Sequence, residues 1–597
     1  METSRFSLPL PGRLRWAGVV ACAALAAILQ GCAGQPTITK LVDGRLIETR
    51  SISPRAYEHA SRAMVYEEED RFAEAVAEYK TALQYDAESA ELNARMAEAY
   101  LQLDDAPNAQ AAVDRSLAIE VTVDGVVAAS HLALQRGRAK DAAAVLLRAV
   151  PLINFANEAE AAERVYLERA DAQVMALLPA EAMATLETLL SGLPTSQMGL
   201  YRQVSIAWAV GDLPLARRYL ERLIQIEPEH LEARLLLARL FTVLQKRDDA
   251  RTAYVEALSR SEGDLSVAAM YATFLESEGL HEETVALVEQ MQTSEMDAGT
   301  LGSRMELERI AGRLPRALQM ADEVLATHPD QESAGRVLLA KGAVLEASQR
   351  PVEAAQIFQS IAAESPSFAE GRLRATAILR DQGKVREAQS LLATIAVDNL
   401  DELMKDEVVV ARALVAASAG NLIEGRRLLA PSGQKKAVTS RIALARAVLE
   451  DKYGDWTQAL ALSESVLAKD LASAEALNFW AFVAAEKKHM LPTARARAEA
   501  ALAFDPGSAA IMDTLGWIYL QMDKPQNAQT FLEGAAAIQP DDPEIMSHVA
   551  ALYVRLGKAD VALAKVKRAL ELSRDPALSI KLQALQKSVG TMKGTAN

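Results

Sequence analysis

The sequence predicts an all-α protein built from about fifteen successive helix pairs, and three observations support this prediction. Hydrophobic residues make up 50% of the 597 residues, whereas aromatic residues make up only 5%. Alanine and leucine dominate, with glutamate, arginine and glutamine between them, and these are strong helix formers, whereas strands favour β-branched and aromatic residues. A pattern of small and bulky residues also recurs about every 34 residues through most of the chain.

The first segment, residues 1–31, has the pattern of an export signal. Arg13 and Arg15 precede a short apolar run from Trp16 to Leu29. This run is too short to cross a bilayer as a helix, for which roughly 20 apolar residues are needed. A positive flank followed by a short apolar core therefore predicts a cleaved signal peptide.

The apolar run ends in Leu29-Gln30-Gly31-Cys32, which resembles the lipobox of bacterial lipoproteins. In that family the signal is cut between Gly31 and Cys32, and Cys32 then carries acyl chains such as palmitate. The alternative is an ordinary signal peptide with an incidental cysteine. The cysteine count disfavours it, because the other cysteine, Cys22, lies inside the signal, and a single mature cysteine cannot form an internal disulfide.

Acylation would hold the chain at a membrane without a spanning helix, since each buried methylene contributes about 0.8 kcal/mol. The resemblance also implies a location. Ala33 after the cysteine is typical of lipoproteins sorted to the outer membrane of a Gram-negative cell. We therefore expect a lipid-anchored protein whose body faces the periplasm.

Residues 32–54 comprise the lipidated N-terminus and a polar tether. Two β-prone runs, residues 38–42 and 45–49, flank the dipeptide Asp43-Gly44, which is typical of a hairpin turn. An isolated hairpin is only marginally stable in water. We therefore favour an unstructured tether, and a hairpin that orders against a partner is the alternative.

The repeating pattern runs from residue 55 to residue 576. Four residues near the C-terminus, Gly516, Tyr519, Ala528 and Ala535, recur 34 positions later as Ala550, Tyr553, Ala562 and Ala569. This pattern resembles the tetratricopeptide repeat family, in which each repeat is a pair of antiparallel helices. Small residues at positions 8, 20 and 27 let the two helices approach closely, and a glycine or polar residue near position 15 ends the first helix.

Fifteen repeats fit this pattern. Their starts lie near residues 56, 90, 123, 163, 197, 231, 265, 298, 335, 369, 406, 440, 474, 509 and 543. Position 20 is filled by Ala216, Ala250, Ala317, Ala354 and Ala388, and the closing turns hold Pro228, Pro329, Pro366, Pro506 and Pro540. The pattern is weak over 123–196 and 403–473, where its register stays open and Gly425 replaces alanine.

The resemblance implies a superhelical solenoid in which each repeat buries its apolar face against its neighbours. The last segment, residues 577–597, predicts a capping helix over Leu578 to Val589 and a loose tail from Gly590.

Motifs for chemistry are incomplete. The segment beginning His281-Glu282 starts like a zinc-protease helix, but Val285 stands where the second histidine is required. Ser432 and Lys435 have the spacing of penicillin-binding enzymes without the companion motifs. A formal net charge of −16 disfavours nucleic acid as a partner. We therefore predict no catalytic residue, no metal, no cofactor and no enzymatic activity.

By the family's geometry, positions 2, 5, 9 and 12 of each repeat line a concave groove that binds proteins or peptides. The candidates at these positions are Tyr57, Met64, Glu98, Arg239, Arg380, Asp513 and Trp517. Trp517 is the candidate of most interest, because an exposed aromatic anchor is a common hot spot of binding.

The lipobox, the long array and the segment Asp513-Thr514-Leu515-Gly516-Trp517 together resemble a group of proteobacterial outer-membrane repeat lipoproteins. Some members are adaptors of periplasmic C-terminal processing proteases. The resemblance implies a scaffold that presents substrates to such a protease or activates it. The alternative is an assembly scaffold for envelope machinery such as a type IV pilus or exopolysaccharide export.

Overall fold

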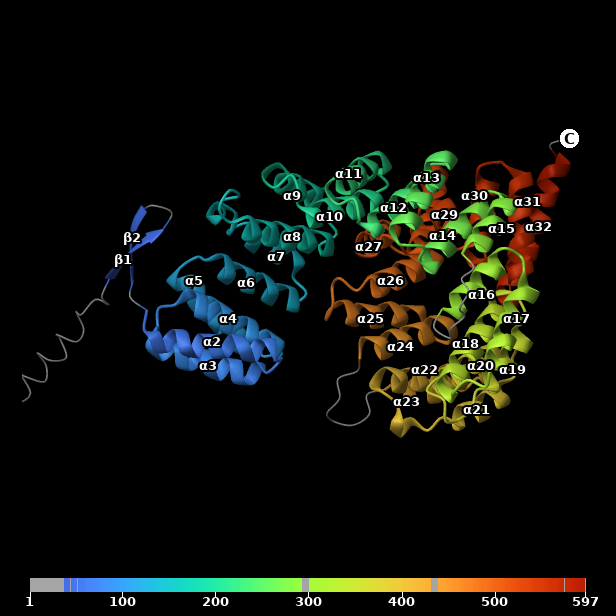
Figure 1. The fold of residues 1–597 in the computed structure, drawn as a ribbon, viewed down its shortest axis with the longest axis horizontal. Helices are drawn as coiled ribbons and strands as arrows, with labels where there is room; N and C mark the ends of the chain where they lie inside the picture. The colour runs from blue at the N-terminus through green and yellow to red at the C-terminus, as the bar shows by residue number, and fades with distance from the viewer. Residues whose placement is uncertain are drawn as a thin grey trace, which may run out of the picture. The chain divides into compact units, whose positions relative to one another are not determined.

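The computed structural model describes residues 37–42, 45–50, 52–291, 300–430, 439–573 and 575–595. Within these ranges the chain forms two strands, 31 α-helices and two short 3-10 helices (Figure 1). The strands are β1 (Thr37–Val42) and β2 (Arg45–Arg50), and the 3-10 helices are η1 (Val150–Leu152) and η2 (Val397–Asn399). The all-α prediction for the repeat region is confirmed.

The α-helices follow one another along the chain with short turns between them. The first half of the series is α2 (Pro54–Glu68), α3 (Phe72–Tyr85), α4 (Ala90–Gln102), α5 (Ala106–Ile119), α6 (Val123–Gln135), α7 (Ala139–Leu146), α8 (Ala159–Met175), α9 (Pro179–Gly192), α10 (Gln197–Ala209), α11 (Leu213–Ile226), α12 (Leu231–Val243), α13 (Arg247–Arg260), α14 (Leu265–Ser277), α15 (His281–Gln290), α16 (Leu301–Ile310) and α17 (Leu314–Leu325). The second half is α18 (Gln331–Ala347), α19 (Pro351–Gln359), α20 (Phe368–Asp381), α21 (Val385–Ala393), α22 (Glu402–Ser418), α23 (Leu422–Leu428), α24 (Ser440–Tyr453), α25 (Trp456–Leu467), α26 (Ala474–Glu486), α27 (Leu491–Phe504), α28 (Ala509–Gln521), α29 (Pro525–Ile538), α30 (Pro543–Arg555), α31 (Ala559–Leu572) and α32 (Pro576–Thr595).

Taken two at a time, helices α2 to α31 give the fifteen expected pairs in the part of the chain that the structure describes. Most first helices begin at the residue expected from the sequence, and the rest begin within about four residues of it. The register slips where extra residues lie between repeats. The helix η1 precedes α8, and the helix η2 precedes α22, so each extra turn displaces the pattern that follows it.

The positions reserved for small residues lie at the contacts between paired helices. Ala216, Ala250 and Ala317 are fully buried, which confirms their expected packing role. Gly425 stands at the same repeat position in α23 and is buried too. A Cβ there would lie 3.0 Å from the Ala413 carbonyl oxygen, so glycine lets α23 approach α22 closely.

Strands β1 and β2 pair as an antiparallel hairpin in which Val42 faces Arg45 and Thr37 faces Arg50. For these residues the favoured prediction of an unstructured tether is wrong, because the hairpin named in the alternative forms. Its ordering against a partner stays a prediction. Six residues pair along the full length of each strand, so the backbone groups that face the partner strand are hydrogen-bonded within the hairpin.

The chain divides into two compact units, and we describe each by itself. Unit 1 extends to Ala128 and unit 2 begins at Ala129, so the boundary falls within α6. In unit 1 each helix from α2 to α5 packs on the next. Ala63, Ala75 and Tyr79 are fully buried at these contacts.

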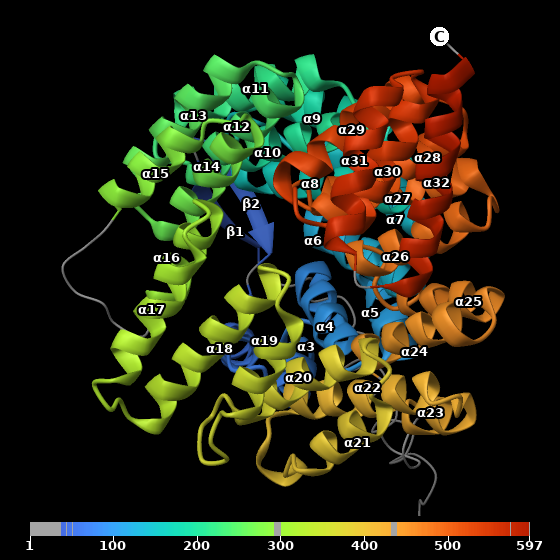
Figure 2. The same cartoon turned by 90° about the vertical axis from the view of Figure 1, so that its right-hand side faces the viewer.

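In unit 2 the repeats near the beginning pack against the repeats near the end. Helix α10 contacts α27, and α12 and α14 contact α29. Both views show the green helices α12 and α14 beside the red helix α29 (Figures 1 and 2). One continuous cluster of buried apolar side chains includes Trp208 of α10, Leu236 of α12 and Phe531 of α29.

This closure corrects the prediction that each repeat packs only against its sequence neighbours. Glycines allow the close approach. A Cβ at Gly534 of α29 would lie 3.0 Å from Val243 Cγ2 of α12. Gly211, in the turn after α10, has its backbone beside the Phe531 ring, which would lie 3.5 Å from a Cβ placed there. The last repeats of the array and helices α10 and α12 of its middle repeats therefore share an apolar core.

The last helix, α32, caps the array and extends to Thr595. Its residues Leu582 and Val589 are seven positions apart on one face and are fully buried. The capping helix was expected, but the loose tail from Gly590 was not observed, because the helix continues through Gly590. Good helix formers, among them Met592 and Lys593, follow Gly590 and extend the helix past it.

Candidate functional site

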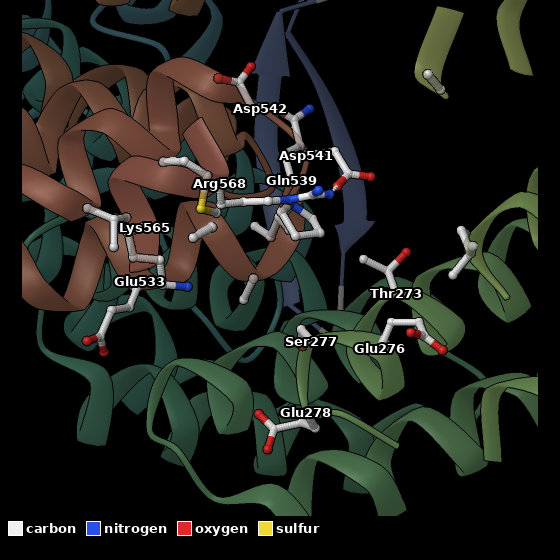
Figure 3. A pocket seen from close by; sticks show the side chains of 18 of the residues that line it. Thr273, Glu276, Ser277, Glu278, Glu533, Gln539, Asp541, Asp542, Lys565 and Arg568 are labelled. Atoms are coloured by element: carbon white, nitrogen blue, oxygen red, sulfur yellow. Dashed lines mark hydrogen bonds and ion pairs between the residues drawn. The ribbon is translucent and has the colours of Figure 1, made fainter. Parts of the chain in front are cut away.

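A cavity of about 1060 Å³ lies in unit 2 where the last two repeats of the array meet repeats from its middle. One wall is formed by the C-terminal turns of α12, α14, α16 and α18, and the other by the end of α29 together with α30 and α31. Figure 3 shows Glu276, Glu278 and Thr273 on the green side of this cavity, and Glu533 and Lys565 on the red side.

Hydrogen bonds and ion pairs join the two walls. The Gln245 side-chain amide donates to Glu533 Oε2 at 3.2 Å. The Arg309 guanidinium donates to Asp541 Oδ2 at 3.3 Å, and Asp541 also accepts from Arg568. The bonds of Gln245 and Arg309 connect residues more than 200 positions apart in sequence, so the cavity exists only because distant repeats of unit 2 pack together.

The titratable groups of the walls influence one another. The hydrogen bond to Glu306 raises the pKa of the Arg309 guanidinium, burial lowers it, and the Glu306 and Asp541 charges raise it further, so that the net shift is upward. Burial raises the pKa of the Tyr553 hydroxyl, and its hydrogen bond to Glu533 raises it further. Arg309 therefore stays charged and Tyr553 stays a donor at neutral pH.

A second cavity of about 440 Å³ adjoins the first. The two share Thr273, Glu306 and Ile310 on one wall and Ala537 and Ile538 on the other. The second cavity is lined largely by apolar side chains from α14, α16 and α29. The joined cavities thus have a charged end and an apolar end.

Two of the sequence-predicted residues, Asp513 and Trp517 of α28, belong to one cluster. His548 of α30 is buried, with its Nδ1 atom 2.8 Å from Asp513 Oδ2. The Trp517 ring stacks on the His548 ring with 4.2 Å between centroids, and its indole nitrogen donates to Glu486 of α26 at 2.8 Å. Trp517 is half-buried. Through these contacts it links α26, α28 and α30, the first helices of three successive repeats.

The two predicted arginines lie elsewhere in unit 2. Arg239 of α12 lines the second cavity, where its guanidinium lies 3.8 Å from Met270 Sδ. Arg380 of α20 forms an ion pair at 2.9 Å with its neighbour Asp381. Of the predicted groove residues, Arg239 lines the smaller cavity, and the others line neither of the two.

The remaining predicted groove residues belong to unit 1. Tyr57 and Met64 of α2 are 54% and 41% exposed and lie seven residues apart on one helix face. Glu98 of α4 is half-buried. Tyr57 and Met64 therefore form a small exposed apolar surface on unit 1.

Other predicted features lie outside the described residues or make different contacts. Gly31, Cys32, Ser432 and Lys435 are outside the described ranges. His281 lies at the start of α15, exposed, with its Nδ1 atom 3.0 Å from Glu276. Among the residues that the structure places, no group of three or more histidine, cysteine, aspartate or glutamate side chains is arranged to hold a metal ion. In the same part of the chain, every helix is too short or too polar to cross a bilayer.

The residues that join the walls, such as Gln245, Arg309, Glu533 and Asp541, were not predicted from the sequence. They are ordinary polar residues of the repeats. Gln245, Arg309 and Asp541 lie in the last turn of a helix or shortly after it, which the repeat register does provide, whereas Glu533 lies within α29. These residues meet across the cavity only because the last repeats pack against the middle repeats of unit 2. The repeat pattern does not predict that packing.

Comparison with protein families gives matches described as tetratricopeptide repeat at residues 66–129 and 207–274, at residues 309–367 and at residues 509–542. These segments cover less than half of the chain. They lie largely outside the regions 123–196 and 403–473, where the pattern was weak. No curated protein matches the sequence.

Two solved structures are similar over most of their length. The first is described as the structure of Naa15/Naa10 bound to HypK-THB, with 13% identity over 91% of this chain and 97% of that chain and a TM-score of 0.31. The second is the APC/C hetero-tetramer Cut9-Hcn1, with 14% identity over 85% of this chain and 98% of that chain and a TM-score of 0.30. Likeness at this level carries no information about partners.

Proposed function

We propose that this tetratricopeptide-repeat protein is a non-enzymatic scaffold, anchored to a membrane by acyl chains on Cys32, that binds segments of other proteins in unit 2. The observation that carries the proposal is the cavity of about 1060 Å³ walled by repeats from the middle of the array and by its last two repeats. Ligand pockets typically measure about 300–1000 Å³, and polar groups fix the bound molecule in them. This cavity reaches that size and offers carboxylates, amides and guanidinium groups for recognition.

A photo-crosslinking amino acid tests the binding site. It replaces Thr273, which lines both cavities, in cells that express the full chain. The matched control position is Thr188, which is exposed on α9 and does not line either cavity. We expect cross-linked proteins at position 273 and not at 188. Equal cross-linking at both positions, or none at 273, would contradict binding in the cavity.

The identity of the cross-linked proteins tests the finer proposal. We propose an adaptor that presents substrates to a periplasmic C-terminal processing protease or activates it, which is supported by the resemblance of the lipobox and of residues 513–517. A periplasmic serine protease or its substrates among the products would support this role. Components of type IV pili or of exopolysaccharide export would instead support the alternative role in envelope assembly.

Anchoring at the periplasmic face of the outer membrane is part of the proposal and is supported by the sequence around Cys32. The variant Cys32→Ser should lose incorporation of labelled palmitate and leave the outer-membrane fraction. The variant Cys22→Ser is the matched control, because Cys22 lies within the signal segment and should not affect acylation. Retention of palmitate in Cys32→Ser, or no palmitate in the wild type, would contradict the proposed anchor.

A further inference from the structure

We propose that the joined cavities of unit 2 bind an extended segment of a partner protein in which lysine or arginine residues lie next to an aliphatic residue. This inference rests on the proposed function and specifies the chemistry of the partner. It follows from the charge of the larger cavity, the direction of the helices that surround it and the apolar lining of the smaller cavity.

The larger cavity is more acidic than the chain as a whole. Its lining contains seven carboxylates and three cationic side chains, whereas the whole chain has 80 acidic and 64 basic residues. Two of the three cations, Arg309 and Arg568, are already paired with Asp541. Arg309 also pairs with Glu306, so these two cations are balanced by the two carboxylates Glu306 and Asp541. The other five carboxylates face one further cation, Lys565, and the cavity presents a net negative surface to a ligand.

The helices add to this negative potential. Helices α12, α14, α16, α18 and α29 all have residues of their last turn, or just beyond it, in the lining of the cavity. The C-terminus of a helix carries a partial negative charge of about half an elementary charge. Asp542, the N-cap of α30, also lines the cavity, so one positive helix end partly offsets the five negative ends, and their sum still favours cationic groups.

Glu276 and Glu278 are the carboxylates best placed to pair with a ligand from the wall of α14. Their own partners are largely exposed: His281 beside Glu276 and Arg247 beside Glu278 have side chains 60% and 45% accessible. Exposed pairs are weak, at about 0.2–1 kcal/mol. A cationic side chain that enters the cavity can replace these partners at little cost.

The smaller cavity specifies the neighbouring residue of the ligand. Leu265, Met270, Ile310 and Ile538 supply aliphatic lining, and Thr273 and Glu306 line both cavities. An aliphatic side chain in the smaller cavity would therefore lie directly beside the acidic surface. The larger cavity measures about 1060 Å³ and the smaller one about 440 Å³. This space suits several residues of an extended chain.

Selection from a random peptide library tests the proposal on the chain from residue 33 onward, immobilised through an added C-terminal tag. The probes are displayed peptides of ten random residues, sequenced after selection. We expect enrichment of peptides in which lysine or arginine lies next to leucine, isoleucine, valine or methionine. Binding of such a peptide should weaken as salt is added, because salt screens the charges.

Three variants locate the binding. Glu276→Gln/Glu278→Gln should weaken the selected peptides about 5-fold, as expected for the loss of two solvent-accessible charge pairs. Glu282→Gln/Glu475→Gln is the matched control, since these exposed residues carry the same charge and lie outside both cavities. Ser303→Trp places a large side chain in the smaller cavity and should remove the preference for the aliphatic residue.

The outcomes separate this inference from the proposed function. Basic and aliphatic peptides that respond to the cavity variants but not to the control support the inference. Peptides of another composition, or peptides that bind all variants equally, would overturn it, while protein binding would stand. A selection that yields no peptide, together with no cross-link at position 273, would overturn both.

Discussion

The buried pair of His548 and Asp513 connects two neighbouring repeats near the end of the array. Burial lowers the pKa of the His548 imidazole, but the charge and hydrogen bond of Asp513, and the charges of Glu544 and Glu486, raise it by more, so the net shift is upward. The ring also stacks on Trp517. A protonated His548 is thus stabilised by the fold.

The folded-state pKa of His548 lies above the unfolded value of about 6.5. The protonated histidine therefore contributes its full stability below about pH 6.5, and this contribution is lost as the pH rises through the folded-state pKa. We expect His548→Gln to lower the free energy of unfolding by about 3 kcal/mol at pH 6, as for a broken buried pair, and by less at pH 9.

Denaturant unfolding followed by tryptophan fluorescence at both pH values measures this effect. His281→Gln is the control, because His281 is exposed and its replacement should change stability little at either pH. A difference between wild type and His548→Gln that is the same at pH 6 and pH 9 would show that His548 does not change its charge on folding.

Backbone conformation gives a second prediction for single residues. The turn after the first helix of a repeat uses a left-handed residue, such as Gly383 at φ 73° and Gln349 at φ 61°. A side chain in this region costs about 1–2 kcal/mol. A Cβ at Gly383 would have open space around it, so Gly383→Ala should destabilise the fold by about 1 kcal/mol through backbone strain alone.

Gln349→Gly is the matched change in the opposite direction. It relieves the same strain, partly offset by the greater freedom of glycine in the unfolded chain, and should stabilise the fold by a few tenths to about 1 kcal/mol. Differential scanning calorimetry of both variants checks the two signs. Shifts of the same sign would mean that side-chain contacts, and not the backbone, determine the stability of these turns.

At the scale of helix pairs, the closeness of the two helices depends on the residue at position 8. A Cβ at Gly516 of α28 would lie 2.6 Å from Leu532 Cγ and 3.0 Å from the Leu532 backbone nitrogen of α29. Because the backbone cannot easily move, we expect Gly516→Ala to cost about 1–3 kcal/mol, as for an overpacked core. Chemical denaturation measures the loss.

Gly302→Ala is the control for this change within another helix. A Cβ at Gly302 of α16 would meet Ala340 Cβ at 3.5 Å, which is an ordinary contact. Since alanine is a better helix former than glycine, this variant should gain up to about 1 kcal/mol. If both variants were destabilised alike, close packing at Gly516 would not be the cause.

The helix pairs were the part of the fold that the sequence could predict. Alanines such as Ala216 and turn residues such as Gly383 report contacts within one repeat, and these contacts are local in sequence. The prediction failed for the hairpin of β1 and β2, because the marginal stability of isolated hairpins outweighed the signal of Asp43-Gly44. It shifted by about four residues at α8 and α22, where extra residues have no repeat counterpart.

At the scale of unit 2, the closed arrangement could not be predicted from the repeat. Gly534, Val243 and Phe531 satisfy the pattern of ordinary repeat residues, and nothing in their spacing indicates that α12 and α29 meet. The candidate cavity was missed for the same reason. Whether distant repeats of a solenoid meet depends on the sum of small rotations between many successive repeats. A pattern within one repeat does not specify that sum.

The packing of α10, α12 and α14 against α27 and α29 predicts the effect of a truncation on the structure of unit 2. In an open solenoid, removal of residues 474–597 would expose α25 and leave distant repeats unchanged. In unit 2 it also removes α27 and α29 from α10, α12 and α14. We therefore expect faster hydrogen exchange of backbone amides in α10 and α12, by about 10-fold or more, with no change in α20 and α21, which pack on α19 and α22. Exchange followed by mass spectrometry of the truncated and full chains measures both regions.

The full-length variant Gly534→Leu gives an independent readout, because its side chain would push Val243 and α12 away from α29. The opposite result is faster exchange confined to α24 and α25 in the truncated chain, with no change at α12 in Gly534→Leu. It would mean that the array is open in solution and that the cavity between the middle and last repeats does not form.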